Sequence, residues 1–342
     1  MGIPFLPFWG ALADRYARQP IIVRSFVAHL VAGVVALLAP NVWVFLLGRS
    51  VMAFALGNSG LMMTTLTERA PRERIGLAFS IFNASAPIGA FLGPLLGGPI
   101  VDRYGLPTLL GIDAALIVAV ILALTFGYRD YFRGAARGPL LAMAADSIGI
   151  IVRSPRLRAL FPALFVLFAG WMLAFVYVPL AVTALYQGPA VGTAVGVAIG
   201  AGGFATLVVS PAMGLLADRL GHWRVLYGGS VCAVALWPLP ALAGDLVSFT
   251  IAWAALNAVT SGVFALSFSV LASSAESEVR GRVMSFAYLP VNVGFAVGPA
   301  LGSIVTRWSV FAVFPVAAVI TGLGIVALIV AERQRVAVPA AA

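Results

Sequence analysis

The sequence predicts an all-α polytopic membrane protein built from two related halves. Three observations carry this prediction: the composition, a series of long apolar stretches, and a repeat that spans most of the chain. Of the 342 residues, 62% are hydrophobic and 10% are charged, and the mean hydropathy is +1.05. A soluble protein of this length could not bury so much apolar surface, so lipid must be its main solvent.

Apolar stretches recur between short polar breaks, and each is about 20 residues or longer, enough helix to cross a hydrocarbon core of about 30 Å. Ten complete spans are predicted, at residues 21–39, 41–66, 76–101, 107–127, 159–186, 190–217, 225–243, 246–272, 283–306 and 309–331. Residues 1–12 are also apolar, but as a helix they would cover only about 18 Å. We therefore expect them to be part of a longer helix.

The chain contains a repeat with an offset of about 204 residues. Residues 10–15 read Gly-Ala-Leu-Ala-Asp-Arg, and residues 214–219, 204 positions further on (214 − 10), read Gly-Leu-Leu-Ala-Asp-Arg. A second glycine-rich string follows each copy, at residues 89–98 and again at 294–302. Two matched strings in the same order indicate that the chain is a duplicated unit.

The arginines predict the topology. All 21 basic residues are arginines, and 18 of them fall on one side of the membrane if the loop after residue 15 is cytoplasmic. Only Arg103 and Arg307 fall on the other side, and Arg49 lies within a span. Because cytoplasmic loops carry the excess of positive charge, we expect a multi-pass protein of the inner (plasma) membrane with a cytoplasmic C-terminus. This charge sorting accounts for the basic balance without a nucleic-acid partner, and the single cysteine, Cys232, excludes an internal disulfide.

Four segments are predicted: an N-terminal half at residues 1–127, a cytoplasmic linker at 128–158, a C-terminal half of six helices at 159–331, and a cytoplasmic tail at 332–342. The linker could form an amphipathic helix on the membrane surface or remain partly disordered.

With its repeated Gly-x-x-x-Asp-Arg motif, the chain resembles the major facilitator superfamily, and within it the twelve-helix drug:proton antiporters. Members have two six-helix halves, with this motif after helix 2 and again after helix 8. The resemblance implies that residues 1–12 are the end of helix 2, so that helix 1 and part of helix 2 are missing from an N-terminally truncated chain. Three positions depart from the family pattern: Ala17 replaces a glycine, Gln19 a basic residue, and His222 an arginine.

In the family, this motif latches the cytoplasmic side shut, because its carboxylate caps the positive end of a helix from the other half. The alternative is a tight charged turn that obeys the positive-inside rule. The residues expected to form this gate are Gly10, Asp14, Arg15, Arg18, Gly214, Asp218 and Arg219.

The glycine-rich string predicts a closely packed, bendable helix. Gly89, Gly93 and Gly97 share one helix face, and Pro94 removes a backbone hydrogen bond; Gly98 completes the string. The string resembles the helix-5 signature of exporters and so favours export over import. Ordinary packing of small residues is the alternative.

Ionisable side chains inside the hydrocarbon are costly and usually functional. Arg49 and Asp113 are the candidates for proton coupling. Arg49 could instead snorkel to the outer surface, and Asp113 could be an interfacial residue. His29 is expected to be a packed, hydrogen-bonded helix residue.

A central cavity would need inward-facing polar and aromatic groups, although each candidate could equally join helices by hydrogen bonding. The candidates are Asn58, Met62, Asn83, Trp171, Tyr177, Asn257, Tyr288 and Asn292. Together they describe a mostly apolar, aromatic chamber, which suits lipophilic or amphiphilic molecules better than sugars or phosphates.

We therefore expect a monomeric secondary active transporter that exports drug-like or other small amphiphilic molecules in exchange for protons, without a cofactor or metal. An exporter of a specific metabolite or sugar, or a non-transporting relative, is the alternative. Residues 57–60, Gly-Asn-Ser-Gly, resemble a string of rhomboid intramembrane proteases, but neither histidine, His29 or His222, lies in a later membrane helix where that chemistry needs it. The sequence has no phosphate-binding loop of the Gly-Lys-Ser/Thr type, no metal-ligand cluster and no His-Glu-x-x-His, so nothing in it supports ATP-driven transport or metalloprotease activity. We do not expect an enzyme.

Overall fold

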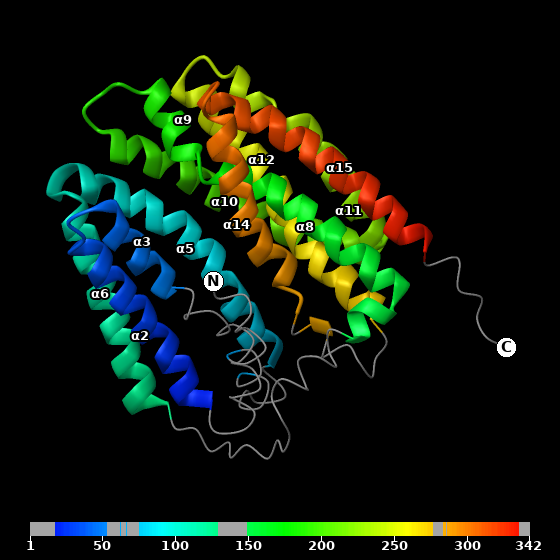
Figure 1. Cartoon of the computed structure of the whole chain (residues 1–342), viewed down its shortest axis with the longest axis horizontal. Coiled ribbons are helices and arrows are strands. Elements are labelled where there is room, and N and C mark those ends of the chain that lie inside the picture. Colours follow the sequence, from blue (N-terminus) through cyan, green and yellow to red (C-terminus); the bar gives the residue numbers. More distant parts are fainter. Residues whose placement is uncertain are drawn as a thin grey trace. The chain divides into compact units, whose positions relative to one another are not determined.

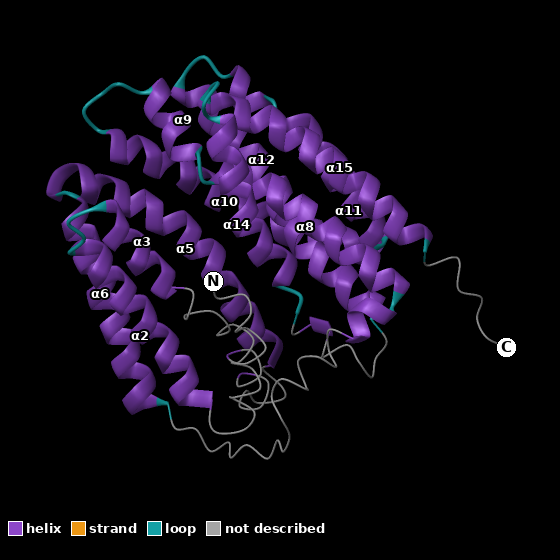
Figure 2. Cartoon of the chain, in the orientation of Figure 1, coloured by secondary structure: helices purple, strands orange, loops and turns teal. Residues whose placement is uncertain are grey.

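A computed structural model describes residues 18–52, 62, 66, 75–128, 149–275, 283–284 and 286–334, of which 75–80 and 83 are described by their backbone alone. Throughout this described part the regular elements are helices, and it contains no strand (Figures 1 and 2). The chain divides into two compact units, Met1–Asn83 with Arg103–Ile148, and Ala84–Asp102 with Gly149–Ala342. The helix α5 (Ile75–Tyr104) contributes to both.

The first unit contains α2 (Arg18–Leu37), α3 (Val42–Val51) and α6 (Leu106–Leu122), which continues as the π-helical turn η4 (Ala123–Gly127). The helix α2 packs against both α3 and α6. Asn41 begins α3, because its side-chain oxygen accepts the first free backbone N–H groups of the helix at 3.0 Å each.

Gln19 ties the start of α2 to the end of α6. Its amide nitrogen donates hydrogen bonds to the backbone carbonyls of Leu124, Thr125 and Tyr128, at 2.7, 3.2 and 2.6 Å. The last carbonyls of a helix lack partners within the helix, so this side chain satisfies them. Gln19 therefore holds a structural contact at the position where the family pattern has a basic residue.

The second unit consists mainly of long helices. They are α8 (Pro155–Phe175), α9 (Val178–Leu185), α10 (Val191–Leu220), α11 (His222–Leu236), α12 (Leu246–Ser274), α14 (Leu289–Val305) and α15 (Val313–Arg333), with short 3₁₀ turns η5 (Leu239–Leu242) and η6 (Val310–Ala312). In Figure 1, α8 lies beside α12, α14 and α15, against which it packs. The unit buries large side chains completely, among them Trp237, Trp253, Phe249 and Phe314.

The observed helices confirm the predicted fold class. Among the described residues, eight helices are long and apolar enough to cross a membrane, and two shorter apolar helices, Val42–Val51 and Leu289–Val305, lie within two further predicted spans. The span predicted at 159–186 is interrupted between α8 and α9, where the ring nitrogen of Pro179 cannot donate the helical hydrogen bond.

Candidate functional site

Within the second unit, α5 and α10 pack backbone against backbone. A Cβ atom added at Gly203 would lie 2.6 Å from the carbonyl carbon of Ala90, and one at Gly196 would collide with the carbonyl oxygen of Pro94. Only residues without a side chain allow so close an approach. We call this contact the glycine seam; its members are Ala90, Pro94 and Gly98 of α5 and Gly192, Gly196, Gly200 and Gly203 of α10.

Asp102 closes one end of the glycine seam. Its Oδ1 accepts a hydrogen bond from the backbone N–H of Gly192 at 2.7 Å, and its Oδ2 accepts from the N–H and the hydroxyl of Thr193, both at 2.6 Å. The N–H groups of a first helical turn have no partner within the helix, so this carboxylate satisfies them and meets the positive end of the helix dipole. We call this contact the Asp102 clasp.

The glycine of α5 that makes the close approach is Gly98, which lies next to the helix face predicted from Gly89, Gly93 and Gly97. A Cβ at Gly89 or Gly93 would meet no described atom within 4 Å, whereas one at Gly98 would collide with the carbonyl oxygen of Gly192. The reason is the rotation of α5 about its axis. The face that meets α10 carries Ala90, Pro94 and Gly98, each one position after a glycine of the predicted face.

Six aromatic rings of the second unit form a continuous series of contacts, which we call the aromatic chain. Its members in order are Tyr288, Phe268, Phe264, Trp171, Phe175 and Trp253, with successive ring centroids 4.8, 5.0, 5.5, 5.8 and 5.8 Å apart. Trp171 and Tyr288 were predicted to line a cavity, whereas the phenylalanines were not singled out. Their signal was present in the sequence, because Trp171 with Phe175 and Phe264 with Phe268 are each four residues apart on a helix.

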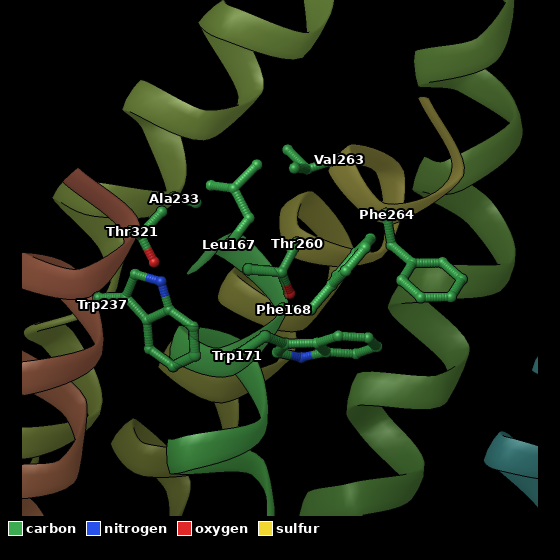
Figure 3. A pocket seen from close by; sticks show the side chains of 9 residues that line it. All are labelled: Leu167, Phe168, Trp171, Ala233, Trp237, Thr260, Val263, Phe264 and Thr321. Atoms are coloured by element: carbon green, nitrogen blue, oxygen red, sulfur yellow. The ribbon is translucent and has the colours of Figure 1, made fainter. Parts of the chain in front are cut away.

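A small cavity lies beside the aromatic chain (Figure 3). It measures about 20 Å³ and is lined by Leu167, Phe168, Trp171, Ala233, Trp237, Thr260, Val263, Phe264 and Thr321. The indole nitrogen of Trp237 and the hydroxyl of Thr321 face it, and this buried nitrogen has no hydrogen-bond partner among the described residues. A cavity of this size has room for about one water molecule, so a substrate would have to separate side chains to enter here.

Two predicted cavity residues join helices in the structure. Tyr177 donates its hydroxyl hydrogen to the carbonyl of Pro299 at 2.8 Å and so ties the α8–α9 turn to α14. Asn257 of α12 is buried and donates to the hydroxyl of Thr206 of α10 at 3.1 Å. These contacts correspond to the helix-joining alternative weighed from the sequence.

Met62 packs against Ile21 and Ile22 of α2, and Asn292 is half-buried on α14. The remaining predicted cavity side chains, Asn58 and Asn83, lie outside the described residues.

The second copy of the Asp-Arg motif lies at the C-terminal end of α10. The carboxylate of Asp218 is 3.7 Å from the imidazole of His222, four residues further on, so this contact is local. A Cβ at Gly214 would meet no described atom within 4 Å, and Arg219 lies in the last helical turn. In the first copy, Arg18 is buried at the start of α2; Gly10, Asp14 and Arg15 lie outside the described residues.

The structure places Asp113, one of the two candidates for proton coupling, beside His29. His29 of α2 and Asp113 of α6 are 3.7 Å apart and both are partly exposed. Arg49 is exposed and its guanidinium donates to the sulfur of Met52 at 3.1 Å. His29 and Asp113 lie seven or eight residues from the nearest ends of α2 and α6, about 10–12 Å into the apolar spans.

Long apolar helices, a duplicated glycine-rich motif and backbone-to-backbone packing define a polytopic helical membrane protein. The sequence model of the Major Facilitator Superfamily matches residues 1–242 and 183–341, which together span nearly the whole chain. The chain belongs to this superfamily and is a multi-pass membrane transporter of small molecules rather than an enzyme.

Similar sequences include two proteins named Multidrug resistance protein MdtG. That of Enterobacter lignolyticus (strain SCF1) is 27% identical over 333 residues, covering 92% of this chain and 75% of the relative. That of Klebsiella pneumoniae (strain 342) is 27% identical over 321 residues, covering 91% and 76%.

Solved structures confirm the fold. A peptide transporter POT in complex with sulfate matches 97% of this chain and 84% of its own, with a TM-score of 0.73 and 15% identity. A variant of the Escherichia coli fucose:proton symporter, FucP, matches 96% and 87%, with a TM-score of 0.63 and 16% identity. At these identities the likeness concerns the fold alone.

Proposed function

We propose that this transporter exports drug-like, lipophilic or amphiphilic molecules in exchange for protons. The observation that carries the proposal is the aromatic chain. Ring faces attract flat apolar molecules and organic cations without requiring a fixed pattern of hydrogen bonds. Such a surface suits chemically varied substrates, whereas a sugar would need many directed donors and acceptors.

The relatives support the same direction, because the MdtG proteins are named for multidrug resistance and align with most of this chain. The glycine-rich string of α5 adds to this support by its likeness to the exporter signature. Export of one specific metabolite or sugar is the alternative that the experiment below distinguishes.

For the transport cycle, we propose alternating access by two halves, residues 1–127 and 159–331, with the linker 128–158 and the tail 332–342 in the cytoplasm. In this scheme the seam between α5 and α10 joins a helix of one half to a helix of the other. Because the seam lacks side chains that interlock, the two helices can separate and meet again with little side-chain rearrangement.

For proton coupling, we propose the pair of His29 and Asp113. The two side chains are 3.7 Å apart, on neighbouring helices and within apolar spans. Ionisable side chains in such a place are costly and mark proton or ion pathways in membrane proteins. Arg49, the other candidate, is held by Met52 in the structure and is the matched comparison.

The test is ethidium efflux from a pump-deficient bacterium that expresses the chain, with and without a protonophore. Efflux that the protonophore abolishes is the expected result. Efflux that persists with the proton gradient collapsed contradicts proton coupling. If the inserted protein exports no ethidium or other lipophilic cation, drug export is wrong, and a specific substrate becomes the leading explanation.

A further inference from the structure

The Asp102 clasp belongs to a sequence pattern that recurs elsewhere in the chain. Residues 98–105 read Gly-Pro-Ile-Val-Asp-Arg-Tyr-Gly, and residues 214–221 read Gly-Leu-Leu-Ala-Asp-Arg-Leu-Gly. Both have a glycine, an Asp-Arg pair four residues later, and a final glycine after one more residue. The final glycines, Gly105 and Gly221, have positive φ angles of 82° and 94°, a backbone conformation that side chains disfavour. The two segments therefore end their helices in the same way.

The two segments act at opposite ends of one helix. Residues 214–221 form the C-terminal end of α10, whereas Asp102 binds Gly192 and Thr193 in its first turn. The 30 residues of α10 span about 45 Å, more than the hydrocarbon core of about 30 Å. The two Asp-Arg pairs thus lie on opposite sides of the membrane.

We propose that Asp102 is the latch that holds the transporter closed on the side opposite to Asp218, which is the outer side in the topology proposed above. The proposal rests on the proposed alternating access. The clasp forms only when the two helices touch, because Asp102 reaches first-turn N–H groups that adjoin the glycine seam. When the helices separate, all three hydrogen bonds of the carboxylate are lost together, so the clasp favours the closed arrangement.

The other copy of the repeat lacks this carboxylate. The glycine-rich strings are 205 residues apart (294 − 89), and the segment after the second string is one residue shorter. Residues 100–103 read Ile-Val-Asp-Arg and residues 304–307 read Ile-Val-Thr-Arg, so Thr306 stands where the first copy has Asp102. Its hydroxyl donates to the carbonyl of Ser303, within its own helical segment, at 3.2 Å. Of the two copies of the repeat, only the first therefore has the aspartate at this position. The threonine of the second copy suggests Asp102→Thr as an informative substitution.

The two ends of α10 also differ in the structure as expected of a latch that is made at one end. Asp102 binds across from α5 to α10, whereas Asp218 lies 3.7 Å from His222, the first residue of the next helix and only four residues further along the chain.

The test measures access to the seam with a cysteine placed behind the clasp. The single native cysteine is replaced by Cys232→Ala, and Leu95→Cys is introduced, because Leu95 is half-buried against Gly200 in the seam. A membrane-impermeant maleimide is then applied to intact cells and to inside-out vesicles. We expect Asp102→Asn and Asp102→Thr to raise the labelling rate severalfold in intact cells. The matched control Arg103→Gln, which removes the neighbouring charge and keeps the carboxylate, should leave the rate unchanged.

No increase in either Asp102 variant overturns the latch, and an increase confined to inside-out vesicles overturns its outer placement. Labelling needs neither a substrate nor a proton gradient, so it can support the latch even if ethidium is not exported. A second measurement covers variants that fold poorly: Asp102→Cys with Thr193→Cys should form a disulfide that stops transport until it is reduced. Failure to cross-link, or normal efflux from the cross-linked protein, contradicts the proposal.

Discussion

The glycine seam and the aromatic chain lie in the same unit and use opposite means of packing helices. In the seam, carbonyl groups of α5 occupy the places that side chains of α10 would fill. In the aromatic chain, six large rings lie 4.8–5.8 Å apart between their centroids. The seam is defined by backbone positions, which cannot adapt to an added atom, whereas rings can rotate and shift. The comparison therefore places the closest fit at the contact that we propose opens and closes, and the adaptable side chains at the surface that we propose meets substrates.

The sharpest way to break this comparison is to add one methyl group to the seam. Gly98→Ala should reduce efflux about tenfold or more, because the new Cβ collides with the carbonyl of Gly192 and overpacking costs about 1–3 kcal/mol. Gly93→Ala, in the same helix with open space around it, is the matched control and should remain active. Efflux and the amount of folded protein in the membrane are measured for both; equal activity would contradict the importance of the seam.

A change in the aromatic chain should have a smaller effect that depends on the substrate. Trp171→Ala removes contacts with two rings of the aromatic chain. Because the remaining rings can shift to close part of the gap, we expect a net loss equal to about one such contact, about 0.5–1.5 kcal/mol, which lowers ethidium efflux about 2- to 10-fold. Trp171→Phe keeps a ring and should restore most of the activity. Trp308→Ala is the control, because Trp308 is exposed and does not belong to the aromatic chain. A uniform loss across all substrates would indicate a folding defect instead.

We do not assign proton coupling to the glycine seam or to the aromatic chain. A variant that affects proton coupling should therefore lie outside both of them. Asp113→Asn should abolish the proton release that ethidium causes in the detergent-solubilised protein, while ethidium still binds, because the carboxylate proposed to carry the proton has been removed. Proton release is followed with a pH-indicator dye in weak buffer. Loss of proton release in Arg49→Gln and its retention in Asp113→Asn would reverse the assignment.

The smallest effect is expected at Asp245, an aspartate that caps its own helix instead of a neighbouring one. Its side chain accepts the backbone N–H groups of Val247 and Ser248 at 2.8 and 2.9 Å. Asp245→Ala should lower the melting temperature by about 1–3 °C without changing the substrate range. The backbone and then the hydroxyl hydrogen bonds of Ser248 lower the pKa of Asp245 below its ordinary value of 3.8.

The cap of Asp245 therefore contributes fully at neutral pH and loses its contribution as the pH falls through the lowered pKa. Asp245→Asn keeps the accepting oxygen without the charge and should remove this acid dependence. A melting temperature of Asp245→Asn that follows the parent protein down to acid pH would contradict the role of the carboxylate.

Much of the fold could be predicted because lipid imposes long apolar helices that are visible in sequence. The glycine-rich string likewise indicated close packing in α5. The register of that packing could not be predicted, because whether Gly93 or Gly98 meets a neighbour depends on how α5 is rotated. Asn257 and Tyr177 illustrate the same limit: composition marks a polar group in a membrane helix, but only the position of the neighbouring helix decides whether it joins helices or faces a cavity.

Other features were present in the sequence and become informative once the contacts are known. The string at residues 98–105 matches that at 214–221, but its meaning depends on Asp102 meeting the start of α10. The pairing of His29 with Asp113 depends on α2 lying against α6, which no local pattern specifies.

The small cavity beside Trp171 has a consequence for affinity. A substrate that enters between rings in contact must first break the attraction between those rings. Its own contacts with the rings offset this cost, so the net free energy of binding is modest whatever the area of contact. Modest affinity gives short residence times. A transporter must release its substrate in every cycle, so short residence times allow a higher turnover rate.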